Sequence, residues 1–134
     1  MHSTKVYGLD IEEFTPAEIC EKVGVSRFGD YQLIESIEES YQMIQYARKH
    51  LDRSHVRQAA LQCCVCAYEA YRRYYNNHYP IHRNSYNDPN TIEFWTDPSN
   101  IIELYEFMKA DGIFQKKSDD IKKELKDLED ARTT

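Results

Sequence analysis

Two long stretches of helically spaced apolar side chains, separated by a very short connection, constrain this chain more than any other feature. Over residues 31–51 the apolar positions recur at intervals of three, four and seven, and over residues 55–77 they form an unbroken stripe. Both spacings are those of an amphipathic helix. The first stripe comprises Ile34, Ile37, Tyr41, Ile44 and Leu51, and the second comprises Val56, Ala60, Cys63, Ala67, Tyr71 and Tyr74. Because only residues 52–54 connect them, we predict an antiparallel helix hairpin.

Capping residues mark three further helices. Thr15 precedes a proline and lies three residues before a glutamate, which is the pattern of a capping box, and Gly24 is placed to end a helix over residues 15–24. A second start of a capping residue followed by proline, Asp97-Pro98, predicts a helix over residues 98–110. A last helix is expected over residues 118–130, charged on all sides except for a narrow apolar stripe of Ile121, Leu125 and Leu128.

The remaining segments carry no helical period. Residues 1–14 are expected to form an N-terminal arm or a short strand, and residues 78–96 a polar loop with a short apolar piece near its end. The chain has 134 residues, of which 41% are hydrophobic and 30% charged, and these values are typical of one globular domain. The fold class that we expect is all-α: a small helical bundle built on a long antiparallel helix hairpin, with a short N-terminal arm and a charged C-terminal helix.

All four cysteines fall in expected helices, at Cys20, Cys63, Cys64 and Cys66. Three of them stand within four consecutive residues, so their side chains point to different faces of one helix, which suits neither a disulfide framework nor a tetrahedral metal site. No run of about 18 apolar residues predicts a membrane span, and the N-terminus lacks the apolar run of a signal peptide. We therefore expect a cytoplasmic protein with reduced thiols and with no metal, cofactor or membrane contact.

The net charge of -6 is distributed unevenly along the chain. Residues 1–45 hold 3 Lys+Arg against 9 Asp+Glu, residues 46–83 hold 7 against 2, and residues 84–134 hold 7 against 12. The basic middle segment interleaves tyrosines with Arg72, Arg73 and Arg83, a composition that can bind the phosphates and stack the bases of a nucleic acid. The alternative is internal ion pairing, because the hairpin brings this end of the chain toward Glu35, Glu38 and Glu39.

Arg73 and His78 are separated by four residues, a spacing that resembles the motif of the helical HEPN ribonucleases. The resemblance implies metal-independent cleavage of RNA by the arginine and histidine of paired subunits, with histidine working near its own pKa. The sequence departs from the family's pattern because His78 comes at a helix end just before Pro80, whereas the family's motif usually opens a helix. The other interpretation is that Arg73 pairs with acidic neighbours while His78 helps to end the helix.

Residues 15–33 resemble a DNA-binding helix-turn-helix, through the small residue at Cys20, the glycine at position 24 and the apolar residues Ile19, Val23 and Leu33. The resemblance implies a nucleic-acid-binding regulator. It departs from the pattern where Gly29 weakens the recognition helix and Asp30 takes a position that should be apolar. The segment is also acidic and would repel phosphates, so we do not expect it to bind duplex DNA.

Aromatic residues gather around the expected loop, at Tyr79, Tyr86, Phe94 and Trp95. Such residues suit a partner-binding surface, and the alternative is that they pack between helices. The sequence contains no Walker loop, dinucleotide fingerprint or nucleophile elbow. We therefore expect a non-enzymatic helical protein-interaction module, an adaptor, regulator or inhibitor acting through an acidic and aromatic surface. The expected partner is another protein or a second copy of this chain, and RNA is the partner under the ribonuclease interpretation.

Overall fold

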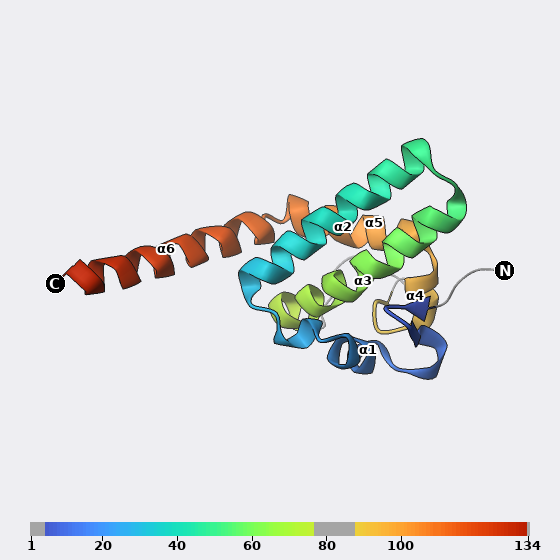
Figure 1. The fold of residues 1–134 in the computed structure, drawn as a ribbon, viewed down its shortest axis with the longest axis horizontal. Coiled ribbons are helices and arrows are strands. Elements are labelled where there is room, and N and C mark those ends of the chain that lie inside the picture. The colour runs from blue at the N-terminus through green and yellow to red at the C-terminus, as the bar shows by residue number, and fades with distance from the viewer. Residues whose placement is uncertain (1–4, 77–87, 134) are drawn as a thin grey trace.

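The fold of the chain comes from a computed structural model that describes residues 5–76 and 88–133 (Figure 1). Helices account for most of it, and the one small sheet within the described residues has two strands. In chain order the elements are β1 (Lys5–Val6), β2 (Leu9–Asp10), the 3-10 helix η1 (Ile11–Glu13), α1 (Pro16–Val23), the 3-10 helix η2 (Val25–Arg27), α2 (Asp30–His50), α3 (Arg53–Tyr75), α4 (Ile92–Thr96), α5 (Pro98–Ala110) and α6 (Ile113–Thr133). The expected all-α class is confirmed.

The predicted helix hairpin is present as α2 and α3, which pack against each other along much of their length. The connection is closed by Asp52, whose side chain accepts a hydrogen bond from the backbone N–H of His55 at 3.1 Å. This interaction satisfies one of the backbone donors that every helix start leaves unpaired. The stripe of α2 that faces α3 includes Leu33, Ile37 and Ile44, all of which are fully buried.

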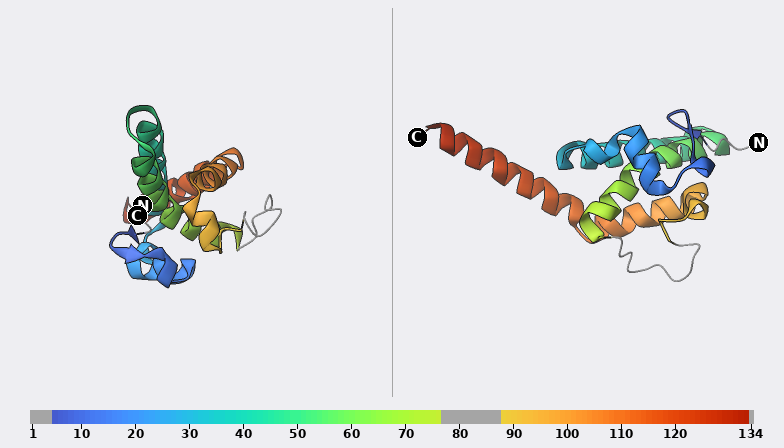
Figure 2. Two further views of the ribbon diagram at one scale, coloured as in Figure 1. Left: turned by 90° about the vertical axis from the view of Figure 1, so that its right-hand side faces the viewer. Right: turned by 90° about the horizontal axis from the view of Figure 1, so that it is seen from below.

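Helix α3 is the central element of the molecule and is enclosed by the others (Figures 1 and 2). It contacts α1, α2, α4, α5, η2 and β1. Every residue over positions 63–71 is buried, and because this stretch covers more than two helical turns, the helix has no solvent-exposed side there. Many of its side chains are small, and small side chains let the surrounding helices approach closely: they are Ala59, Ala60, Cys63, Cys64, Cys66, Ala67 and Ala70.

The start and the end of α1 are as the sequence predicts. The hydroxyl of Thr15 accepts from the backbone N–H of Glu18 at 3.2 Å, and the Glu18 carboxylate accepts from the backbone N–H of Thr15 at 3.0 Å. At the other end Gly24 adopts φ +99°, in the left-handed region that favours glycine, and donates its N–H to the carbonyl of Cys20. The capping box and the glycine together fix the length of this short helix.

The N-terminal segment, expected as an arm or a short strand, forms the β1–β2 hairpin. Lys5 pairs with Asp10 and Val6 with Leu9 in antiparallel register. The side chain of Val6 is fully buried, and Gln58 of α3 donates a hydrogen bond to the carbonyl of Lys5 at 3.1 Å. The hairpin is therefore attached to α3 and forms part of the folded body.

The C-terminal part of the chain differs from expectation in two places. The segment expected as a loop through residue 96 contains the short helix α4, whereas α5 has the predicted bounds. The last helix begins at Ile113, five positions before the predicted start, because Gly112 at φ +78° turns the chain directly from α5 into α6. Figures 1 and 2 show that α6 then leaves the body and projects away from it.

None of the helices in the described parts of the chain is both long and apolar enough to cross a membrane.

Candidate functional site

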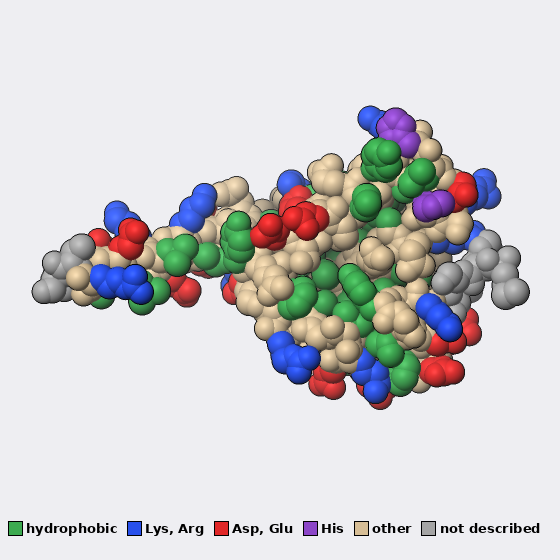
Figure 3. Space-filling model, viewed as in Figure 1, with side chains coloured by type: hydrophobic (Ala, Val, Ile, Leu, Met, Phe, Trp, Pro, Cys, Tyr) green, Lys and Arg blue, Asp and Glu red, His purple; other side chains and the backbone are tan. Residues whose placement is uncertain are grey.

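An open groove of about 640 Å³ crosses the surface where the β1–β2 turn, α1, η2, α2 and α3 meet. Figure 3 shows hydrophobic side chains gathered on this face of the molecule between α1 and α2. The apolar and aromatic members of its lining are Tyr7, Leu9, Val23, Val25, Phe28, Met43 and Cys66, and the polar members are Lys22, Ser36, Glu39, Ser40 and Gln62. This composition, mostly apolar with a few polar groups, is typical of a binding site.

The groove continues along the outer face of α2. A second hollow of about 510 Å³ shares Glu39 and Met43 with the first and extends over Tyr46 to His50. The side chains of Met43 and Tyr46 are 55% and 54% exposed, and the Tyr46 ring lies 4.8 Å from the ring of His50. From residue 36 to residue 50 the helical rise amounts to about 21 Å, so the two hollows form a strip about four helical turns long.

The ionisable groups that line the first groove do not form a catalytic arrangement. Burial raises the pKa of the Cys66 thiol to about 11. The pKa of the Tyr7 hydroxyl is also raised, mainly by burial and to a smaller extent by the nearby Cys66. Neither side chain is therefore a ready nucleophile or base at neutral pH. The remaining charged groups of this lining are Lys22 and Glu39, which come from different helices. The groove offers a hollowed shape, apolar surface and an exposed methionine, a side chain that adapts readily to a partner, and these properties suit binding.

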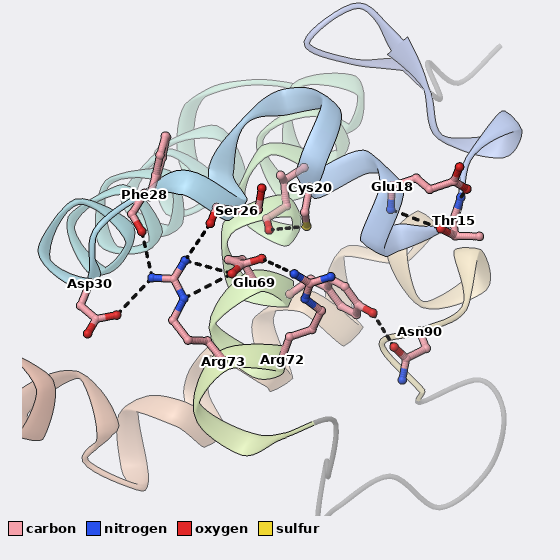
Figure 4. A network of polar contacts seen from close by, with 12 residues as sticks. Thr15, Glu18, Cys20, Ser26, Phe28, Asp30, Glu69, Arg72, Arg73 and Asn90 are labelled. Atoms are coloured by element: carbon pink, nitrogen blue, oxygen red, sulfur yellow. Dashed lines mark hydrogen bonds and ion pairs between the residues drawn. The ribbon is translucent and has the colours of Figure 1, made fainter.

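Arg72 and Arg73, two of the arginines that the sequence singled out, form a compact ion-pair cluster with Glu69 and Asp30 (Figure 4). Its centre is Glu69 on α3, a carboxylate with only 5% of its side chain exposed. One oxygen accepts from Arg72 at 3.1 Å, and the other accepts from Arg73 at 2.9 Å. The expected partners of Arg72 and Arg73 were Glu35, Glu38 and Glu39. The structure instead pairs them with Glu69 and Asp30, and Glu38 accepts from Tyr105 and Lys109 of α5.

Arg73 uses its whole guanidinium group in this cluster. Its Nε and Nη2 both donate to Glu69, Nη1 donates to the Phe28 carbonyl and to the Asp30 carboxylate, and Nη2 also reaches the Ser26 carbonyl. A guanidinium has five N–H groups, and these contacts account for all five. Arg73 thus joins the η2 turn and the start of α2 to α3, and its contacts favour a structural role.

Asp30 explains the departure from the helix-turn-helix pattern. It stands at the first residue of α2, where its carboxylate accepts from Arg73 at 3.1 Å and from the Tyr74 hydroxyl at 2.7 Å. Burial of this carboxylate acts to raise its pKa, but the hydrogen bonds from Tyr74 and Arg73 outweigh that effect and leave the pKa below its ordinary value. An aspartate in a position expected to be apolar therefore serves as a link between α2 and α3.

Several predicted site residues lie outside the described residues: His78, Tyr79, Arg83 and Tyr86. The HEPN-like arrangement of Arg73 with His78 and the basic set that includes Arg83 therefore stay predictions.

Phe94 and Trp95 lie in the core, whereas the sequence led us to expect them at a partner-binding surface. Both side chains are 1% exposed. Helix α4 directs them inward, and the indole Nε1 of Trp95 donates to the Pro89 carbonyl at 2.9 Å, with its ring 5.6 Å from that of Tyr68 on α3. A buried Trp normally has such a polar partner. Here the hydrogen bond joins α4 to the segment just before it, at Pro89.

The four cysteines are all buried and unpaired. Burial raises the pKa of Cys20 and Cys63 to about 12 and that of Cys66 to about 11. Since the thiolate is the reactive form, we expect the native protein to keep its mass during incubation with iodoacetamide at neutral pH. The unfolded chain in denaturant should gain four adducts. Rapid labelling of the native protein, assigned by peptide mapping, would contradict the burial described here, and Cys66 is the thiol to inspect first because it borders the groove.

Comparisons of this chain with models of protein families, with curated proteins and with solved structures each found no match.

Proposed function

We propose that this chain is a non-enzymatic protein-interaction module that binds an amphipathic helix of another protein in the groove along α2. The observation that carries the proposal is the pair of adjoining hollows along about four turns of α2. Apolar and aromatic side chains from several elements gather in the first hollow, and Met43 and Tyr46 of α2 continue that surface into the second. A helix laid in a hydrophobic groove buries an apolar residue at each turn. The polar groups at the edge, Lys22, Glu39 and Lys49, would fix its direction.

The proposal replaces the aromatic surface expected from the sequence with a different one. Phe94 and Trp95 are core residues, whereas Tyr7, Met43 and Tyr46 are more than half exposed. Methionine and tyrosine bury much apolar area and adapt to the shape of a partner, and both are enriched at interfaces. The proposal includes a cytoplasmic location, which the four unpaired thiols support.

A pair of tyrosines on α2 gives a matched test. Tyr46 borders the groove and Tyr31 does not, yet both are exposed, at 54% and 64%. A photoreactive phenylalanine analogue at position 46 should form a discrete protein adduct in extract of the source cells, and the same analogue at position 31 should not. Met43→Glu should then remove the adduct at position 46 without changing the thermal midpoint, because the side chain is exposed.

Three results would speak against the groove as the binding site. These are equal labelling from positions 31 and 46, persistence of the adduct after Met43→Glu, and cleavage of RNA that is lost on His78→Ala. The last of these would instead favour the ribonuclease interpretation.

A further inference from the structure

The projecting half of α6 carries an apolar stripe that nothing in the described parts of the chain covers. Leu125 and Leu128 are 59% and 63% exposed, and every residue over positions 119–132 is exposed except Ile121, which is partly buried. The stripe begins at Phe114, which is buried against the body with its ring 5.7 Å from that of Tyr105. The side that anchors α6 thus continues as an exposed surface along the part of the helix that projects from the body (Figures 1 and 2).

A projecting helix of this kind gains little stability by itself. An isolated helix of about 12–15 residues is marginal in water, and most helices in proteins are stabilised by packing of their apolar side. Ile121, Leu125 and Leu128 follow one another at intervals of four and three, which is the spacing of the buried positions in a two-stranded coiled coil. In heptad notation Leu125 occupies position a, and Ile121 and Leu128 occupy position d.

The charged residues beside this stripe distinguish between the ways in which a second helix could pack on it. The flanking e positions are Lys122 and Glu129, and Glu124 and Lys117 are g positions. In a parallel pair of identical helices, each g position faces the following e position of the other chain. Glu124 would then face Glu129 of the second copy, and Lys117 would face Lys122. Both contacts place like charges together, so the sequence disfavours a parallel pair.

In an antiparallel pair, e positions face e positions. With Leu125 packed against Leu128 of the second copy, Lys122 faces Glu129 of the second copy, and by symmetry this attractive pair occurs twice. A shift of one heptad in either direction would instead bring Lys122 against Lys122, or Glu129 against Glu129. One antiparallel register therefore matches both the apolar stripe and the charges.

The shape of the molecule permits this register. Only the ends of the two α6 helices would overlap, and each folded body would lie beyond the free end of the other helix, because α6 projects away from its own body (Figure 2). We propose that the exposed stripe of α6 pairs with the same stripe of a second copy of this chain as a short antiparallel coiled coil. The proposal does not depend on the groove along α2, which lies on other elements.

Sedimentation velocity of the full chain, from micromolar to millimolar concentration, tests this proposal. The protein should dimerise reversibly, and Leu125→Ser with Leu128→Ser should leave it monomeric while the thermal midpoint of the body is unchanged. Lys122→Glu or Glu129→Lys alone should weaken dimerisation about fivefold to thirtyfold, because each change replaces two attractive contacts with two repulsive ones. The chain that carries both changes should dimerise like the original.

A mixture of the Lys122→Glu and Glu129→Lys chains provides the strictest control. In the proposed register each would pair with the other more tightly than with itself, because both contacts between the two different chains are attractive. A parallel arrangement predicts no preference for the mixed pair, and either single change alone would then strengthen self-association. A monomer at all concentrations, a stronger dimer after one charge reversal, or a dimer insensitive to the loss of both leucines would overturn the proposal.

Discussion

Replacement of Trp95 by alanine should lower the free energy of unfolding by about 3–5 kcal/mol, the usual cost of deleting a fully buried tryptophan side chain. The indole is 1% exposed, donates a hydrogen bond to the Pro89 carbonyl and packs on Tyr68. The alanine variant leaves a cavity between α3 and α4 and an unpaired carbonyl. Because this is the only tryptophan in the chain, far-UV circular dichroism in denaturant, not fluorescence, should follow the unfolding of both proteins.

Two further variants show whether the loss comes from the core. Trp95→Phe keeps most of the ring and loses the Nε1 donor, so its cost should be smaller than that of alanine. Tyr31→Ala removes an aromatic side chain that is 64% exposed and should change stability by no more than about 0.5 kcal/mol. If Trp95→Ala instead reduced association and left the unfolding curve unchanged, Trp95 would belong to an interface and the position of α4 would be wrong.

Arg73→Ala should be the second strongly destabilising change, at about 3–5 kcal/mol, because it removes a partner from Glu69, a carboxylate with only 5% of its side chain exposed. The variant would leave the Glu69 carboxylate with Arg72 alone and would remove the donors to the Phe28 and Ser26 carbonyls. Arg72→Ala is the matched control. Arg72 is the neighbouring residue on the same helix, but it makes a single hydrogen bond to Glu69, so its loss should cost clearly less.

The pH dependence of stability, measured for the original chain and for Arg73→Ala, provides an independent check on the same cluster. The folded state lowers the pKa of Asp30, so the stability that this carboxylate contributes is fully present above its ordinary pKa of about 3.9 and is lost as the pH falls through the lower, folded-state pKa. The stability difference between the original chain and Arg73→Ala should therefore narrow on acidification below about pH 4. A difference that stays constant down to pH 2 would contradict the described contact between Arg73 and Asp30.

The parts of the fold that depend on neighbouring residues were predictable from the sequence. The capping box of Thr15 and Glu18 and the left-handed Gly24 mark both ends of α1 through local hydrogen bonds. The α2–α3 hairpin follows from periodicity and a short connection. Helix α4 was missed because five residues are too few to show a helical period.

The parts that depend on tertiary packing were not predictable in the same way. The inward direction of Trp95 depends on where α4 docks against α3. The groove lies where the β1–β2 turn, α1, η2, α2 and α3 meet, and no sequence pattern predicts that these distant segments come together. One partner of Arg73 could have been found, since Glu69 stands four residues before it on the same helix, a favourable spacing for an ion pair. Asp30 lies 43 residues away in the chain.

The enclosure of α3 also determines which positions of this protein can tolerate substitution during evolution. Along positions 63–71 any larger side chain would press on a neighbouring element in every direction, and such overpacking typically costs about 1–3 kcal/mol. The outer face of α2 and the projecting end of α6 carry no such restriction, because their side chains face solvent. Variation that alters what the molecule binds can therefore accumulate on these two helices, while the buried helix α3 confines neutral change to side chains of nearly the same volume.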